Sequence, residues 1–148
     1  MKKFLAIILA LVMALSLMAC GSAPAQEPGS DADAGTETPV VTDGATLGEG
    51  AHSFTLEITD AEGKTITATI NTDEETVGAA LLKLNIVQGE NSEYGLYVKT
   101  VNGVTADYDK DQTYWSFYID GEYAQTGVDM TAITDGSTYK LAIETMTQ

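Results

Sequence analysis

The sequence predicts one small α+β domain, with a single helix on one face of a mixed β-sheet, between residues 52 and 148. Apolar and polar residues alternate along several short segments of this region, which is typical of half-buried strands. One stripe of apolar residues at helical spacing lies between the second and third of these segments. Asn-Gly and Asp-Gly pairs separate the later strands, as they do in tight hairpins.

Two alternating segments at the start of this region predict a β-hairpin. Every second residue is apolar: Phe54, Leu56 and Ile58 in the first strand, and Ile66, Ala68 and Ile70 in the second. The intervening residues are mostly threonines and the charged Glu57, which would face the solvent. Residues 60–63, Asp-Ala-Glu-Gly, predict the turn between them.

The predicted helix follows this hairpin. Thr72 and Glu75 fit the S/T-x-x-E capping box, in which each side chain binds a free backbone N–H group of the first turn. The apolar stripe consists of Val77, Ala80, Leu81 and Leu84. Asn85 is expected to end the helix in a left-handed conformation.

The remaining strands are predicted from alternation and turn residues. A polar loop over residues 88–93 precedes a third strand at 96–101, which ends at Asn102-Gly103. A fourth strand at 114–119 ends at Asp120-Gly121, is continued by residues 123–126, and is followed by a last strand at 139–143. One helix covering one face of such a sheet is a β-grasp-like arrangement.

The first nineteen residues have the pattern of a secretory signal peptide. Two lysines precede an apolar run over residues 4–17, which is shorter than the ~20 residues that a membrane-spanning helix needs. The run ends in Leu17-Met18-Ala19-Cys20, which resembles the lipobox of bacterial lipoproteins. The resemblance implies cleavage before Cys20, a diacylglyceryl group on its thiol and a fatty acid such as palmitate on its amine. The alternative is an ordinary secretory leader with a cysteine near its cleavage site.

Residues 20–51 are interpreted as the lipid-anchored cysteine followed by a disordered linker. The segment is rich in Gly, Ser, Ala, Thr, Pro, Asp and Glu, contains all three prolines of the chain, and has no periodicity. It has too little apolar area to offset the entropy of ordering. A linker of this kind would hold the domain away from the cell membrane.

Composition excludes several functions. The net charge is -15 with seven lysines and no arginine, which excludes a nucleic-acid partner because phosphate binding needs clustered cations. One cysteine and one histidine, His52, exclude an intrachain disulfide, a multi-histidine metal site and a local histidine-based triad. We therefore expect no catalytic residues and no bound metal, and do not expect an enzyme.

Several short motifs in the second half of the chain carry a resemblance to a known family. They are Thr113-Tyr114-Trp115, Gly121, Gly127-Val128-Asp129, Asp135-Gly136 and Leu141. This series resembles the C-terminal β-domain of the transcobalamin and intrinsic-factor proteins. Residues 52–146 as a whole, including the helix start at 76–81 and the turn at 101–103, resemble the DUF4430 (transcobalamin-like C-terminal) domain of bacterial surface lipoproteins.

The resemblance implies a binding module for a soluble small ligand, with cobalamin or another corrinoid as the first ligand class. In the vitamin carriers this domain closes over one face of the corrinoid while a separate helical barrel holds the other. No pattern for such a barrel is present in these residues. The ligand-binding residues that the resemblance implies are Tyr114, Trp115, Tyr118, Thr126, Gly127, Val128 and Asp129.

The residues themselves leave the role of the aromatic strand open. Alternation places Trp115 and Phe117 on one face of the strand and Tyr114 and Tyr118 on the other. Since one helix covers only one face, one of these pairs belongs to the core and the other is available to a ligand. The alternative is that the exposed tyrosines only pair across strands.

Two further motifs are weaker. Asp107, Asp109 and Asp111 have D-x-D-x-D spacing, but Gln112 and Tyr118 stand where a calcium loop needs Gly and Glu, so a solvated acidic loop is preferred. Residues 137–140 spell S-x-x-K, but in a strand the serine and lysine would face opposite sides, and this reading is rejected.

The sequence thus predicts an extracytoplasmic binding module that is lipid-anchored to the bacterial cell membrane. Its expected ligand is a soluble small molecule, and a transporter or other surface protein is an expected partner. The alternative is a structural or adhesion module of the cell surface that binds another protein.

Overall fold

The computed structural model describes residues 41–146 of the 148-residue chain. The predicted signal peptide (1–19), Cys20 and the linker up to residue 40 lie outside the described residues. Within residues 41–146, no helix has both the length and the apolar character needed to cross a membrane.

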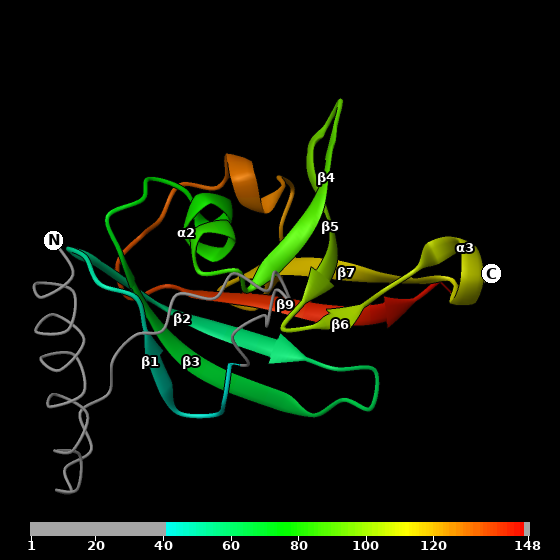
Figure 1. Ribbon diagram of the computed structural model, residues 1–148, viewed down its shortest axis with the longest axis horizontal. Helices are drawn as coiled ribbons and strands as arrows, with labels where there is room; N and C mark the ends of the chain where they lie inside the picture. Colours follow the sequence, from blue (N-terminus) through cyan, green and yellow to red (C-terminus); the bar gives the residue numbers. More distant parts are fainter. Residues whose placement is uncertain (1–40, 147–148) are drawn as a thin grey trace, which may run out of the picture. The chain divides into compact units, whose positions relative to one another are not determined.

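The main sheet has six strands in the order β1-β3-β2-β9-β7-β8 (Figure 1). The strands are β1 (Ala45–Leu47), β2 (His52–Thr59), β3 (Thr65–Thr72), β7 (Thr113–Ile119), β8 (Glu122–Tyr123) and β9 (Thr138–Thr145). At its centre β2 and β9 are parallel, whereas β2–β3 and β7–β9 are antiparallel. The prediction of a mixed sheet that begins with a hairpin is confirmed.

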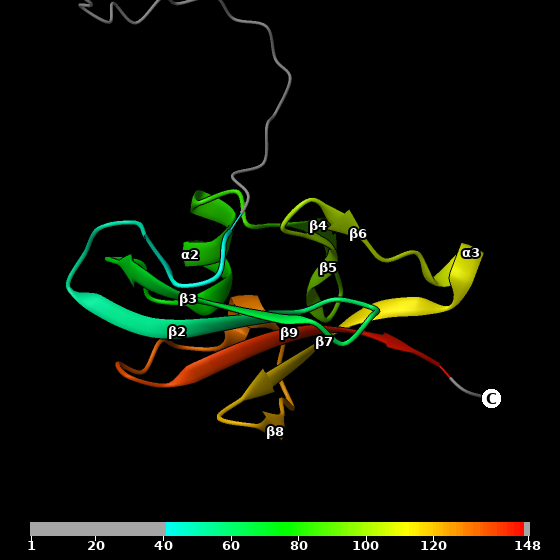
Figure 2. The same cartoon turned by 90° about the horizontal axis from the view of Figure 1, so that it is seen from below.

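A second, three-stranded antiparallel sheet lies on the same side of the main sheet as helix α2 (Figure 2). It consists of β4 (Val87–Ser92), β5 (Gly95–Val101) and β6 (Val104–Thr105). The predicted loop at 88–93 is wrong, because these residues belong to β4 or lead directly into the turn before β5. Only Val87 of β4 is buried, so backbone pairing with β5 forms this strand where no apolar alternation indicates it.

The turns that join the strands have the predicted conformations. Asn102 and Asp120 have φ values of 50° and 49°, and the glycines after them have φ values of 78° and 88°. Both residues of each pair are therefore left-handed, as a two-residue type I′ turn requires. The strand predicted to continue through residue 126 is shorter, because β8 ends at Tyr123.

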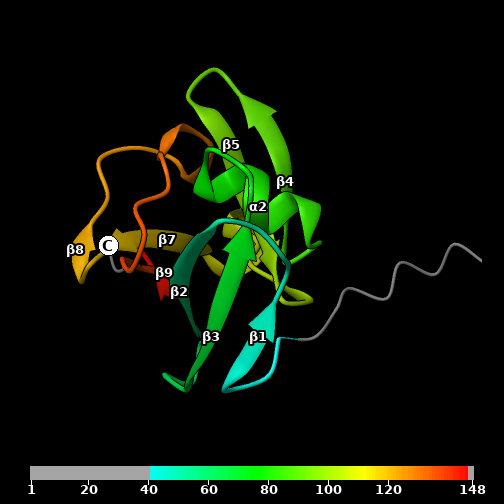
Figure 3. The same cartoon turned by 90° about the vertical axis from the view of Figure 1, so that its left-hand side faces the viewer.

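Helix α2 (Val77–Lys83) packs over the main sheet and begins later than predicted (Figure 3). Its N-cap is Thr76, whose Oγ1 accepts a hydrogen bond from the N–H of Ala79 at 3.3 Å. The predicted cap, Thr72, is instead the last residue of β3 and accepts from the N–H of Glu74 at 3.0 Å. Asn85 follows the helix with φ 54°, as predicted.

Two shorter helical segments accompany α2. Helix α3 (Tyr108–Asp111) replaces the predicted acidic loop, because the Asp107 carboxylate accepts from the N–H groups of Asp109 and Lys110 and so caps the helix. The 3₁₀ helix η1 (Val128–Met130) lies beside α2.

The core lies between the main sheet, α2 and the second sheet. Tyr139 of β9 is the largest fully buried side chain among the described residues, and its ring lies 5.1 Å from that of Phe54 in an edge-on arrangement. The Tyr139 hydroxyl donates to the carbonyl of Ala132 and accepts from the N–H of Thr134. The buried apolar side chains thus form one core cluster, and the Tyr139 hydroxyl within it has hydrogen-bond partners.

The ordered fold begins before His52, so the predicted start of the domain is too late. β1 pairs in parallel with β3, and Val41 is buried at 2% exposure. The Val41 N–H donates to Asn102 Oδ1 at 2.6 Å, and Asn102 Nδ2 donates to the Val41 carbonyl at 3.2 Å. Residues 41–51 therefore belong to the fold, and edge pairing compensates for their low apolar content.

Candidate functional site

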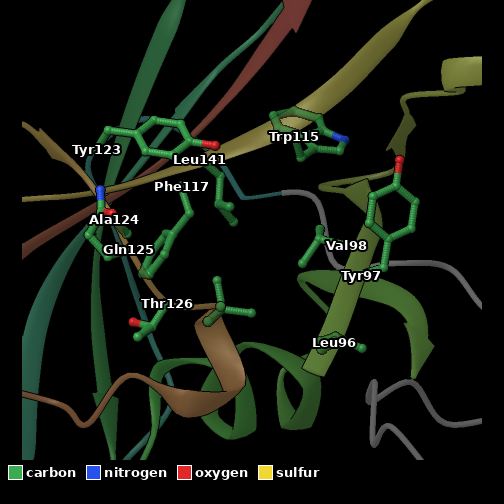
Figure 4. Close-up of a pocket in the computed structure, with 12 residues that line it drawn as sticks. Leu96, Tyr97, Val98, Trp115, Phe117, Tyr123, Ala124, Gln125, Thr126 and Leu141 are labelled. Atoms are coloured by element: carbon green, nitrogen blue, oxygen red, sulfur yellow. The ribbon is translucent and has the colours of Figure 1, made fainter. Parts of the chain in front are cut away.

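A cleft of about 360 Å³ lies between β5 of the second sheet and β7 of the main sheet (Figure 4). The segment that follows β8 and the start of η1 complete its wall. The lining residues are Leu96, Tyr97, Val98, Trp115, Phe117, Tyr123, Ala124, Gln125, Thr126, Gly127, Val128 and Leu141.

The cleft has an apolar floor and a polar rim. Its floor consists of side chains that are less than 10% exposed: Val98, Trp115, Phe117, Val128 and Leu141. Its rim carries the exposed Tyr97, Tyr123, Gln125 and Thr126. None of the twelve lining residues is charged. An apolar concave surface with a few polar groups at its edge is the usual composition of a small-molecule site.

Strand β7 supplies the floor because its register turns Trp115 and Phe117 toward the second sheet. Trp115 pairs with Ile143 of β9, and Phe117 with Leu141. The Phe117 ring stacks on that of Tyr139 with centroids 6.1 Å apart. These cross-strand contacts fix the floor from below.

The turn that bears Thr126, Gly127 and Val128 is held by the helix beside it. Thr131 Oγ1 donates to the Gly127 carbonyl at 2.9 Å, and the Thr131 carbonyl accepts from the N–H of Val77 at 2.9 Å. A Cβ atom on Gly78 of α2 would lie 2.7 Å from the Cα of Asp129. Only glycine at position 78 lets the helix and this turn approach so closely.

Asp129 points away from this cleft into a neighbouring one that is lined in part by Tyr94 and Met130. Its Oδ1 atom is buried and has no hydrogen-bond partner within residues 41–146. Cβ atoms on Gly95 and Gly127 would each approach Oδ1 to 2.8 Å. The Asp129 carboxylate therefore occupies the space beside Gly127 that a Cβ atom there would enter.

Tyr114 and Tyr118 lie on the opposite face of β7, away from the cleft. Both hydroxyls donate to the carboxylate of Glu144 on β9, at 3.0 Å from Tyr114 and more closely from Tyr118. The hydrogen bond to Glu144 raises the pKa of Tyr114 to about 12, and burial adds to the effect. The same bond raises the pKa of Tyr118, and the two phenols lower the pKa of Glu144 against the opposing effect of burial. These tyrosines therefore have a structural partner on their own face of the sheet.

The structure thus divides the seven predicted ligand residues among three places. Trp115, Thr126, Gly127 and Val128 line the cleft, Asp129 faces the adjoining one, and Tyr114 and Tyr118 are on the far face. The opposite wall is formed by Leu96, Tyr97 and Val98, which were not among the predicted ligand residues. The alternation of residues 96–101 indicates a strand but carries no signal that this strand belongs to a second sheet.

The first and last carboxylates of the D-x-D-x-D motif are engaged in local hydrogen bonds. Asp107 caps α3 and contacts Lys110 Nζ at 2.6 Å, which lowers the pKa of Asp107. Asp111 accepts from the N–H and hydroxyl of Thr113. Among residues 41–146 no three His, Cys, Asp or Glu side chains gather in an arrangement suited to a metal ion. On the surface, the Nδ1 atom of His52 in β2 lies 3.2 Å from Oδ1 of Asp135.

Comparison with known proteins places this domain in a family. Residues 74–143 match the family described as "Domain of unknown function (DUF4430)". The chain is also similar to a solved structure of a candidate metal-binding protein from Ruminococcus gnavus, at 30% identity and a TM-score of 0.62. That match covers 66% of this chain and 100% of the other.

A second solved structure, of haptocorrin in complex with Cbi, has the same fold at 17% identity and a TM-score of 0.50. The match covers 65% of this chain and 25% of haptocorrin, so the likeness concerns one part of that protein. No curated protein matches the sequence significantly.

Proposed function

We propose that this chain, which belongs to the DUF4430 family, is a binding module that takes a soluble small ligand in the cleft between β5 and β7. The observation that carries the proposal is the composition of that cleft: five buried apolar side chains below four exposed polar or aromatic ones, without a charge. The fold shared with haptocorrin supports corrinoids as the first ligands to test. The metal-binding description of the Ruminococcus gnavus protein is not extended to this chain, since the described residues provide no such cluster.

The geometry of the cleft sets the expected affinity. Its volume of about 360 Å³ is near the lower end of the range for small-molecule sites, roughly 300–1,000 Å³. A corrinoid would place only one edge in it and keep much of its surface in water. We therefore expect micromolar or weaker binding, on the order of -8 kcal/mol or less favourable.

The test is titration of the domain that spans residues 41–148 with a panel of corrinoids, followed by NMR chemical shifts. Tyr97→Ala removes a rim side chain that is 42% exposed, and Tyr108→Ala is its matched control at 45% exposure outside the cleft. We expect the first substitution to weaken binding about tenfold or more and the second to leave it unchanged. Tyr114→Ala on the far face should also leave binding unchanged. Equal affinity for Tyr97→Ala and Tyr108→Ala would place the ligand elsewhere.

We further propose that Cys20 carries the lipid that holds this module on the outer side of the cell membrane. The Leu17-Met18-Ala19-Cys20 sequence supports this proposal. Two acyl chains or more give the stable anchoring that one chain does not. Cys20→Ser should abolish labelling of the full chain by a radioactive fatty acid, and normal labelling of the variant would refute the anchor.

A surface protein is the alternative ligand. Tyr94 at 87% exposure and Met130 at 67% exposure border the cleft next to Asp129, and exposed Tyr and Met side chains are enriched in protein interfaces. Tyr94→Ala, which does not alter the first cleft, distinguishes the two. Loss of surface-protein binding with unchanged small-ligand binding would favour the alternative.

A further inference from the structure

The single tryptophan of the chain presents an unused hydrogen-bond donor at the cleft. Trp115 is 8% exposed, and its Nε1 atom is buried without a hydrogen-bond partner among residues 41–146. An indole N–H can only donate, so no rearrangement of its own protons satisfies it. A buried donor without an acceptor is costly and calls for an explanation.

Three other buried hydroxyl groups among residues 41–146 donate hydrogen bonds to backbone carbonyls. The Ser116 hydroxyl, adjacent in sequence, donates to the carbonyl of Ala142 at 2.9 Å. The Tyr139 hydroxyl donates to the carbonyl of Ala132 at 3.2 Å. The Thr131 hydroxyl donates to the Gly127 carbonyl at 2.9 Å. The unpaired indole is therefore an exception in a fold that satisfies its neighbours.

The position of Trp115 connects this donor to the cleft. Its ring forms one end of the cleft, and the indole nitrogen points toward the side where Tyr97 lies (Figure 4). Tyr97 comes from the facing strand β5, is 42% exposed, and makes no side-chain hydrogen bond within the described residues. Rotation of this rim side chain would open a path from the cleft to the indole N–H.

The charges around the cleft decide which acceptor fits. An anion is disfavoured, because the chain carries a net charge of -15 and no lysine lines the cleft. A cation gains nothing from an N–H donor. The group that suits this position is a neutral oxygen acceptor such as an amide carbonyl.

We propose that the cleft selects neutral ligands with a carbonyl oxygen that accepts a hydrogen bond from Trp115 Nε1, while their apolar part lies on Phe117, Val98 and Val128. This inference rests on the proposed function, because it names the ligand class for the same cleft. It is independent of whether that ligand is a corrinoid.

The test uses four probes of similar size: benzamide, toluene, benzoate and benzylamine, each added at millimolar concentration to ¹⁵N-labelled protein of residues 41–148. Because the chain has one tryptophan, its spectrum has one indole N–H signal. We expect benzamide to move this signal downfield and to bind at least fivefold more tightly than toluene. Benzoate should bind most weakly, and benzylamine should leave the indole signal in place.

Replacement of Trp115 by the isosteric benzothienylalanine removes the N–H group and keeps the ring. We expect this variant to bind benzamide and toluene with about equal affinity. Trp115→Phe, which can be made by ordinary mutagenesis, also removes the N–H group and should show the same loss of preference. Should neither variant fold, the indole signal of the unaltered protein still decides the matter.

The outcomes separate the two proposals. If backbone signals of Thr126 and Val128 respond to the probes but the indole signal does not, the cleft binds small molecules and the carbonyl inference is wrong. If no probe disturbs any residue of the cleft, the proposed function and this inference both fail. Equal binding of benzamide and benzoate would overturn the selection for neutral ligands.

Discussion

Replacing Gly78 by alanine should destabilise the protein although it strengthens the intrinsic helix propensity of α2. Gly78 is buried in the helix and faces η1. A Cβ atom there would lie 2.7 Å from both the N and Cα atoms of Asp129 and 2.9 Å from the carbonyl carbon of Val128. These neighbours are backbone atoms, so no side-chain rotation relieves the overlap.

The magnitude follows from two opposing effects. Alanine is favoured over glycine in a helix interior by about 0.8–1.0 kcal/mol. Separating the new Cβ from carbon atoms to a normal contact of about 3.5–4.0 Å requires η1 to move by roughly 1 Å. The Val77–Thr131 and Glu75–Ile133 backbone hydrogen bonds tie this segment to the start of the helix and resist the movement. An overpacking cost of about 1–3 kcal/mol, less this gain in helix propensity, leaves an expected net loss of up to about 2 kcal/mol.

The assay is urea unfolding followed by the fluorescence of Trp115, together with binding of the best cleft ligand. The control, Ala79→Gly, lies on a partly exposed side of the same helix and should cost about 1 kcal/mol through propensity alone, without changing ligand binding. Gly78→Ala should also weaken binding, because the displaced η1 carries Val128 out of the cleft floor. A Gly78→Ala protein that is as stable as the unaltered one, or more so, would refute the close contact.

Three further predictions follow from the same contacts. A protein that starts at residue 52 should be less stable than one that starts at residue 41, because it lacks β1 and the buried Val41. Limited proteolysis of the full chain should accordingly yield a resistant core that begins near residue 41 rather than near His52. Glu144→Gln should lower the pKa of Tyr114 from about 12 toward 10.0 in a spectrophotometric titration. Because folding raises the pKa of Tyr114, the Tyr114–Glu144 hydrogen bond contributes its full stability below pH 10, and this stability is lost as the pH approaches 12. Gly127→Ala should cost less than Gly78→Ala, at most about 1 kcal/mol, because its Cβ meets only the side-chain atom Asp129 Oδ1 at 2.8 Å; this cost should vanish in the Asp129→Ala background, whereas additive effects would contradict the contact.

The parts of the fold that the sequence predicts correctly are those in which one face is buried. β2 and β3 show alternating burial, and in β7 the apolar residues Trp115, Phe117 and Ile119 alternate in sequence although Ser116 between them is also buried. β4 escapes prediction because five of its six residues are exposed, so its sequence carries no alternation. β1 escapes because it has three residues and is formed by pairing with a strand twenty residues later.

The start of α2 shows how a local signal can be overruled. Thr72 and Glu75 fit a capping box, but Thr72 pairs with His52 across the hairpin and is buried. Thr76 takes over the cap although Ala79, three residues on, cannot complete a box. Strand pairing from a distant segment thus decided between two threonines that the local sequence ranked in the opposite order.

The sequence predicts the β7 side of the candidate site but not the β5 side, because the two sides come from different sheets. Alternation along β7 separates Trp115 from Tyr114, so the floor residue and the Glu144-bound residue can be assigned to opposite faces. The wall from β5 depends on the second sheet folding over the first, and no local pattern encodes that placement. The same holds for the turn at Gly127, whose position depends on the packing of Gly78 in a different element.

This construction also bears on what a shared fold can say about the ligand. The likeness to haptocorrin concerns a quarter of that chain and the backbone arrangement alone. What a cleft binds depends instead on the side chains that line it. In this cleft they are uncharged, the floor is apolar, and the Trp115 N–H has no hydrogen-bond partner among the described residues. The main sheet holds the floor of the cleft, and α2 holds the turn at residues 126–128. The wall from β5, in contrast, belongs to a hairpin whose other strand, β4, is mostly exposed. The β5 wall, which carries Tyr97, is therefore the part of the cleft that a ligand can move at least cost.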